Sequence, residues 1–146
     1  MSVWKQSALI LGCALLAGAA SALFHPKRPP WYEVEDAAEA RWTIRPEKAR
    51  ELVSAGPVVW IDARSRPAYE VGHVPGALLV NAEEWADLMF QHQFALQEAF
   101  QRPVIVYCDG DSCERSREIA QRLRELVGLD PVFVLQGDWR IVFPEP

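Results

Sequence analysis

The sequence predicts an α/β fold with a parallel sheet of about four to five strands and helices on both of its faces. Short, continuous apolar runs alternate along the chain with segments whose apolar residues recur at helical spacing. A strand that is apolar over its whole length is buried on both faces, which is typical of a parallel sheet covered by helices. The 146 residues allow one such domain with additional sequence at the N-terminal end.

The first half of the predicted domain contains two helices and two strands. A helix starts at Pro46, because Pro is tolerated in a first turn, and ends at Gly56. The apolar runs at residues 58–61 and 77–80 predict buried strands. Between residues 83 and 100 apolar side chains recur at helical spacing, which predicts one long helix.

The second half repeats the alternation. Residues 104–107 and 132–135 are apolar runs that predict two further buried strands. Between them, residues 119–127 have the clearest amphipathic pattern of the chain, and Gly128 ends that helix. In a parallel sheet the ligand crevice lies beyond the carboxyl ends of the strands. The candidate site is therefore expected after residues 61, 107 and 135.

The N-terminal segment is predicted to be a membrane address. Residues 1–24 contain an uncharged apolar stretch from position 7 onward, as in a signal peptide or an uncleaved signal anchor. Ala20-Ser21-Ala22 fits a signal-peptidase site, and both alternatives stay open. Residues 25–41 form a Pro-rich, then acidic, linker, and residues 42–146 form the domain. We expect a membrane-anchored or exported protein whose domain is extracytoplasmic, in the periplasm.

Composition excludes several classes of function. A net charge of -5 and a pI near 5.2 argue against a nucleic-acid partner. His25, His73 and His92 share no metal-ligand spacing, and no nucleotide-binding loop is present, so we expect no metal and no cofactor.

Cys108 is the candidate nucleophile. It directly follows a predicted strand, and a short loop joins it to the strongest predicted helix. Loop N–H groups and the positive end of a helix both stabilise a thiolate or a persulfide anion. Gly110 allows the backbone to curl around the sulfur. The alternative is that Cys108 is simply a small buried core residue.

Three blocks of sequence resemble one family, the rhodanese-like sulfurtransferases, over roughly residues 42–140. The blocks are Asp62-x-Arg64 with Tyr69-Glu70 and Gly72-His73-Val74-Pro75-Gly76-Ala77; Val104 to Cys108 with Ser116-Arg117-Glu118; and residues 132–139, ending in Gly137-Asp138-Trp139. The resemblance implies that Cys108 takes a sulfane sulfur from a donor, holds it as a persulfide and passes it to a thiophilic acceptor. The implied partners are a small sulfur donor or a persulfide-bearing protein, and a thiol acceptor.

The residues around Cys108 have expected roles in supporting the site or in binding the donor. We expect Asp62 and Arg64 to form a supporting ion pair at the mouth of the site. Arg115 either binds an anionic donor or pairs with Glu118 or Asp111. The expected active-site loop consists of Asp109, Gly110, Asp111, Ser112, Cys113 and Arg115, and its amides would surround the sulfur.

The loop departs from the family pattern in two ways. Arg115-Ser116 begins seven residues after Cys108, so the loop is longer than the common one and carries three carboxylates. Those carboxylates would oppose anionic thiosulfate, which favours a neutral or protein-borne donor. Cys113 is also close enough in sequence for a disulfide with Cys108, whereas the alternative is that Cys113 is the first buried residue of the helix.

Other functions remain open at this point. The domain is a sulfurtransferase, a sulfur carrier or protein-interaction module without turnover, or a dithiol redox protein that uses Cys108 and Cys113. A Cys-based phosphatase or arsenate reductase is disfavoured, because those enzymes need a shorter Cys-to-Arg spacing and because an acidic loop repels a phosphate dianion.

Overall fold

The computed structural model describes residues 4–7, 10–14, 16, 40–110 and 114–143, which belong to two separate units, residues 1–35 and 36–146. In the first unit, residues 4–7 and 10–14 are helical and mostly exposed. Among the residues described, no helix combines the length and the apolar character that crossing a membrane requires. Most of the apolar segment lies outside the described residues, so a targeting or anchor role for residues 1–24 stays a prediction.

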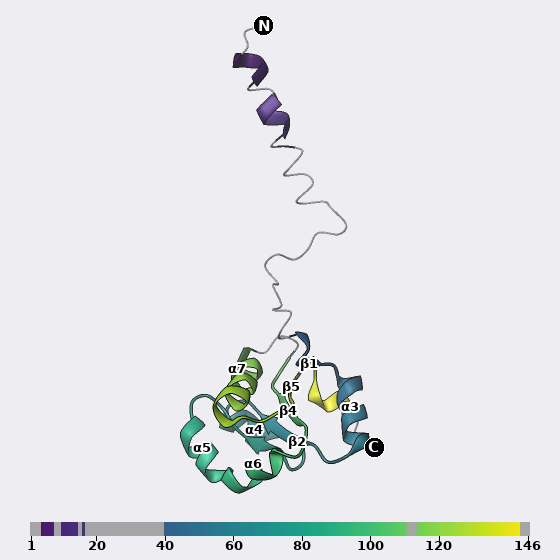
Figure 1. The fold of residues 1–146 in the computed structure, drawn as a ribbon, viewed down its shortest axis with the longest axis vertical. Coiled ribbons are helices and arrows are strands. Elements are labelled where there is room, and N and C mark those ends of the chain that lie inside the picture. The colour runs from purple at the N-terminus through teal and green to yellow at the C-terminus, as the bar shows by residue number, and fades with distance from the viewer. Residues whose placement is uncertain (1–3, 8–9, 15, 17–39, 111–113, 144–146) are drawn as a thin grey trace. The chain divides into compact units, whose positions relative to one another are not determined.

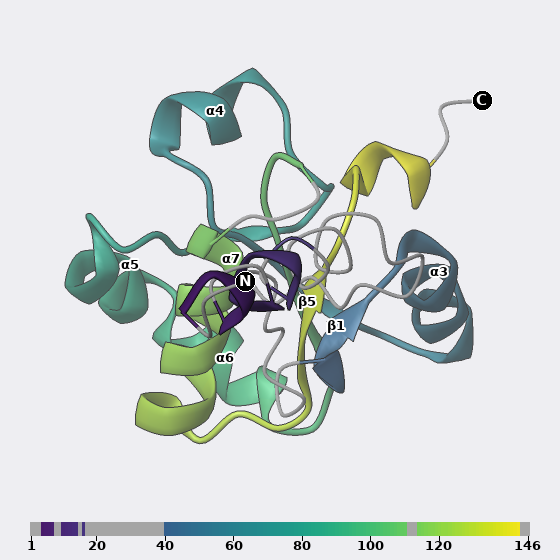
Figure 2. The same ribbon diagram turned by 90° about the horizontal axis from the view of Figure 1, so that it is seen from above.

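The second unit is built on a five-stranded parallel sheet (Figures 1 and 2), as the sequence predicts. The strand order is β1-β5-β4-β2-β3, so β4 and β2 lie side by side near the centre. The strands are β1 (Thr43–Ile44), β2 (Val59–Asp62), β3 (Leu78–Leu79), β4 (Val104–Tyr107) and β5 (Val132–Leu135).

Helices cover both faces of this sheet. Both views place α3 on one side, and α5, α6 and α7 on the other. A π-helical turn and a short 3-10 helix complete the described elements of this unit. The bounds are α3 (Pro46–Ala55), α4 (Arg66–Val71), α5 (Trp85–Gln91), α6 (Gln93–Ala99), α7 (Glu114–Arg122), η1 (Leu123–Val127) and η2 (Trp139–Ile141).

Strand β4 divides the core into two layers. Val104 and Val106 pack in the cluster that includes residues of α6 and α7. Ile105 and Tyr107 pack in the second cluster, which includes Ala49 of α3. Successive side chains of a strand point to opposite faces, so one apolar run supplies both layers. All four side chains are fully buried, which fixes this strand, and the residue that follows it, in a rigid core.

Several predicted elements are confirmed and others need correction. The helix closed by Gly56, the strands at 58–61, 104–107 and 132–135, and the helix that Gly128 ends all appear, with shifts of a few residues at their ends. The prediction of a single helix over residues 83–100 is wrong. His92 ends α5 and starts α6 with φ -98° and ψ 10°, values outside the helical region.

The break at His92 also leads to a prediction about stability. Its Nε2 atom is buried and has no hydrogen-bond partner among the described residues. Burial lowers the pKa of His92 below its ordinary value of 6.5, and the neighbouring Arg66 lowers it further. The unfolded chain therefore binds a proton first as the pH falls, so the free energy of unfolding should decrease below about pH 6.5. His92→Gln should lessen this decrease between about pH 6.5 and 5 in urea unfolding, and an unchanged slope would contradict the assignment.

Candidate active site

The site forms where β2 and β4 end beside one another. In the register of this strand pair Asp62 lies opposite Tyr107, and the N–H of Ala63 donates to the Tyr107 carbonyl at 2.9 Å. Cys108 follows immediately. The parallel topology thus brings Asp62 and Cys108, which are far apart in sequence, to one edge of the sheet, as the strand pattern predicts.

Cys108 itself is buried, with 1% of its surface exposed, and it is disulfide-bonded. Cys13 is free. Cys113, Asp111 and Ser112 of the predicted loop lie outside the described residues. In this state the sulfur of Cys108 is not an available nucleophile, so chemistry at this position requires prior reduction.

Asp109 and Gly110 form a bend directly after Cys108. Gly110 has a φ of 104°, a conformation that favours glycine, although no atom would contact an added Cβ. Glu114 and Arg115 then begin α7, and both side chains are exposed. Glu118 pairs with Arg122 at 2.6 Å, and Arg115 has no ion pair with any of the described residues. The proposed pairing of Arg115 with Glu118 is therefore not the one observed.

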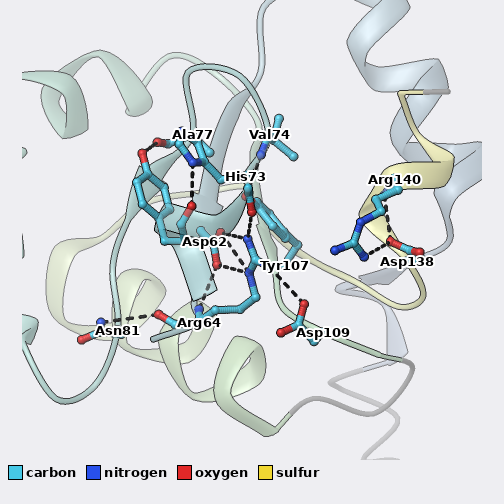
Figure 3. A network of polar contacts seen from close by, with 12 residues as sticks. Asp62, Arg64, His73, Val74, Ala77, Asn81, Tyr107, Asp109, Asp138 and Arg140 are labelled. Atoms are coloured by element: carbon cyan, nitrogen blue, oxygen red, sulfur yellow. Dashed lines mark hydrogen bonds and ion pairs between the residues drawn. The ribbon is translucent and has the colours of Figure 1, made fainter. Parts of the chain in front are cut away.

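Arg64 is the centre of the polar network in Figure 3. Its Nε donates to both carboxylate oxygens of Asp62 at 2.9 and 3.1 Å, and its Nη2 donates to Oδ2 at 2.6 Å. Nη2 also donates to the carbonyl of Gly72 at 2.6 Å. The remaining contact runs from Nη1 to Oδ1 of Asp109, at 3.2 Å. Arg64 thereby links the end of β2 to the residue that follows Cys108.

Aromatic rings and buried charge set the electrostatics of this network. The Arg64 guanidinium lies 5.6 Å from the ring centres of both Tyr107 and Trp139. The hydrogen bond to Asp62 raises the pKa of Arg64, which stays charged throughout the accessible pH range. Burial raises the pKa of Tyr107, whose hydroxyl accepts a 3.0 Å hydrogen bond from the Val74 N–H. The predicted supporting pair, Asp62 with Arg64, is thus a buried ion pair.

The loop after α4 is held beside this pair by Tyr69 and His73. The Tyr69 hydroxyl donates to the Ala77 carbonyl at 2.7 Å. The His73 ring stacks on Tyr69 with a centroid separation of 3.7 Å, and its Nδ1 lies 2.9 Å from the Tyr69 carbonyl. These contacts give His73 a structural role in the loop.

Sequence reasoning missed the link from Arg64 to Asp109 and the contact of Trp139 with Arg64. The Trp139 signal was visible, because the Gly137-Asp138-Trp139 turn follows β5 at the same edge of the sheet. The link to Asp109 had no sequence signal, since it spans 45 positions and depends on the register of β2 with β4.

Comparison of the sequence with models of protein families gives a match to the rhodanese-like domain over residues 45–141, which is most of the chain. This chain belongs to the rhodanese-like family. The rhodanese-like domain is also similar to the thiosulfate sulfurtransferase GlpE of Pseudomonas fluorescens (strain SBW25), with 34% identity over 104 residues, covering 69% of this chain and 86% of that protein.

Solved structures support the fold. The rhodanese-like domain superposes on the BH2092 protein of Bacillus halodurans with a TM-score of 0.54 at 19% identity, covering 70% of this chain and 74% of the other. An uncharacterized protein from Saccharomyces cerevisiae gives a TM-score of 0.52 at 21% identity, with 68% and 88% of the two chains covered. At these identities the likeness concerns the fold alone.

Proposed function

We propose that this protein is a sulfurtransferase in which Cys108, once reduced, carries a sulfane sulfur as a persulfide. The observation that carries the proposal is the place of Cys108 directly after β4, beside the buried pair of Asp62 and Arg64, within a rhodanese-like domain. A relative that shares 34% identity is named a thiosulfate sulfurtransferase, which supports the same reaction class.

The reaction has two sulfur-transfer steps. The Cys108 thiolate attacks the outer sulfur of a donor R–S–S⁻, the S–S bond of the donor breaks, and R–S⁻ leaves with the electron pair. A thiolate acceptor then attacks the outer sulfur of the Cys108 persulfide and regenerates the Cys108 thiolate. No external oxidant or reductant enters this cycle.

The loop and the start of α7 would stabilise the anions of this cycle. Loop N–H groups and the positive end of a helix both favour a negative charge on a nearby sulfur. Arg115, exposed in the first turn of α7, is the residue that we propose to bind an anionic donor. The donor is a small sulfane compound or a persulfide-bearing protein, and the acceptor is a thiol. With residues 1–24 as an anchor or a signal peptide, the reaction would take place outside the cytoplasm, in the periplasm.

Intact-mass measurement after exposure to a sulfur donor tests the proposal. The protein is reduced, the reductant is removed and the donor is added. Wild type should gain the mass of one sulfur atom, whereas Cys108→Ser should gain none, because the persulfide needs this thiol. Cys13→Ser is the matched control, since Cys13 is the free, exposed cysteine, and it should behave as wild type. Equal sulfur uptake by Cys108→Ser would reject Cys108 as the carrier.

One observation favours a second candidate function, a dithiol redox protein. Cys108 is disulfide-bonded and Cys13 is free. Of the three cysteines in the sequence, this leaves Cys113 as the candidate partner. In this reaction two substrate thiols reduce the disulfide and leave as one oxidised pair, while the protein gains two thiols. Cys113→Ser separates the two functions, because it should abolish disulfide exchange and preserve persulfide formation. If the protein takes up sulfur but does not transfer it to any acceptor that is tested, it would instead be the carrier module.

A further inference from the structure

The guanidinium of Arg64 is shared unequally between two carboxylates. Asp62 receives hydrogen bonds from Nε and Nη2, including the short one of 2.6 Å, and it also accepts the backbone N–H of Arg64 at 2.9 Å. Asp109 receives a single contact of 3.2 Å from Nη1. A bidentate pair is stronger than a single longer contact, so the positive charge of Arg64 compensates the negative charge of Asp62 more fully than that of Asp109.

Burial separates the two acids in the same way. The side chains of Asp62 and Arg64 are 0% and 4% exposed, whereas that of Asp109 is 51% exposed. Two carboxylates and one guanidinium leave one negative charge, and the half-exposed acid presents it to solvent. Asp109 is also the residue next to Cys108. The contact with Arg64 thus keeps an incompletely compensated carboxylate beside the reacting position.

Among the residues that the structure describes, Arg64 is the only cation that pairs with Asp109. Glu114 and Arg115, both exposed at the start of α7, carry opposite charges, so together they add no net charge there. Lys and Arg side chains that pair elsewhere, such as Arg122 with Glu118, are already compensated.

We propose that Asp109, positioned by Arg64, determines donor specificity by disfavouring dianionic sulfur donors relative to donors of lower charge. The proposal rests on the proposed function, since it concerns the donor that reaches Cys108. An additional negative charge on the donor is repelled by the half-exposed carboxylate of Asp109, and like charges a few ångströms apart near a protein surface discriminate by about three- to tenfold at low salt. This selectivity would suit persulfides borne by thiols or by proteins better than it suits thiosulfate.

Two donors that differ by one charge provide the test. Thiosulfate, a dianion, transfers its outer sulfur and leaves as sulfite. Methanethiosulfonate, a monoanion, transfers its outer sulfur and leaves as methanesulfinate. Each gives the same Cys108 persulfide with balanced charge. The measured quantity is the ratio of kcat/KM for thiosulfate to kcat/KM for methanethiosulfonate.

Substitutions of Asp109 separate charge from positioning. Asp109→Asn keeps an oxygen that can accept from Arg64 Nη1 and removes the charge, whereas Asp109→Ala removes both. Glu98→Gln is the matched control. Glu98 is an exposed acid 3.5 Å from Arg102, and it lies in α6, which leads into the amino end of β4, the opposite edge of the sheet from Cys108.

Asp109→Asn and Asp109→Ala should each raise the ratio by about three- to tenfold at low ionic strength, and the gain should shrink toward one in about 1 M salt. Glu98→Gln should leave the ratio unchanged. The specificity role is overturned if wild type forms the persulfide but Asp109→Asn leaves the ratio as it was, or if Asp109→Ala slows both donors equally. Failure of the proposed function has a different result, the absence of a persulfide on wild-type Cys108 with either donor.

Discussion

Arg64→Met is expected to lower the free energy of unfolding by about 3–5 kcal/mol. The substitution leaves the fully buried carboxylate of Asp62 without its counter-ion and also removes the donor that binds the Gly72 carbonyl. An unpaired buried charge keeps its desolvation penalty and loses the attraction that offset it.

Arg66→Met is the matched control for this experiment. Arg66 lies two positions away and binds Glu84 at 2.6 Å, but both partners are partly exposed. A solvent-exposed ion pair of this kind contributes far less to stability than a buried one. Both variants are unfolded in urea, in the same redox state as wild type. A loss for Arg64→Met no greater than that for Arg66→Met would show that the buried pair does not hold this edge of the sheet together.

Oxidised protein is expected to transfer sulfur at least about a hundredfold more slowly than reduced protein. In the oxidised state the sulfur of Cys108 is bonded and its residue is 1% exposed, so no thiolate exists to attack a donor. Reduction releases the thiolate at the end of β4. The measurement is the initial rate of sulfur transfer by one preparation before and after reduction, with the reductant removed.

Cys113→Ser is the control for this switch, because Cys13 is free and Cys113 is the remaining candidate partner of Cys108. The variant should be active without reduction, at a rate close to that of reduced wild type. Full activity of oxidised wild type would contradict the requirement for a free Cys108 thiolate. Inactivity of Cys113→Ser together with activity of Cys13→Ser would instead assign Cys113 a part in the transfer itself.

The sequence predicted those elements whose burial produces an apolar pattern in their own residues. Strands β2, β4 and β5 are continuous apolar runs, and α3 and the α7 segment have an apolar stripe with a terminal glycine. Strand β1 has two residues and exists because it pairs with β5, so no local pattern marks it. Helix α4 buries none of its six residues, and the break at His92 lacks a Gly or Pro.

The same distinction applies to the site. The positions of Cys108, Asp62 and Arg64 followed from the order of the strands, because parallel strands present their carboxyl ends at one edge. The disulfide state of Cys108 and the hydrogen bond from Arg64 to Asp109 did not follow, since both depend on side-chain placement in three dimensions. The acidic character of the loop was visible in the sequence, but which acid a buried arginine would hold was not.

The register that sets Asp62 opposite Tyr107 also fixes the place of the buried pair of Asp62 and Arg64, but it does not constrain the residues that would meet the donor. A slip of one residue between these strands would turn every side chain of β2 to the other layer, so the buried pair tolerates no such change. Asp109, half-exposed and outside the paired strands, is under no such restriction. A chain of this kind can therefore acquire a preference for a new sulfur compound through insertions or altered charges there, while the barrier to unfolding set by its central strands stays the same.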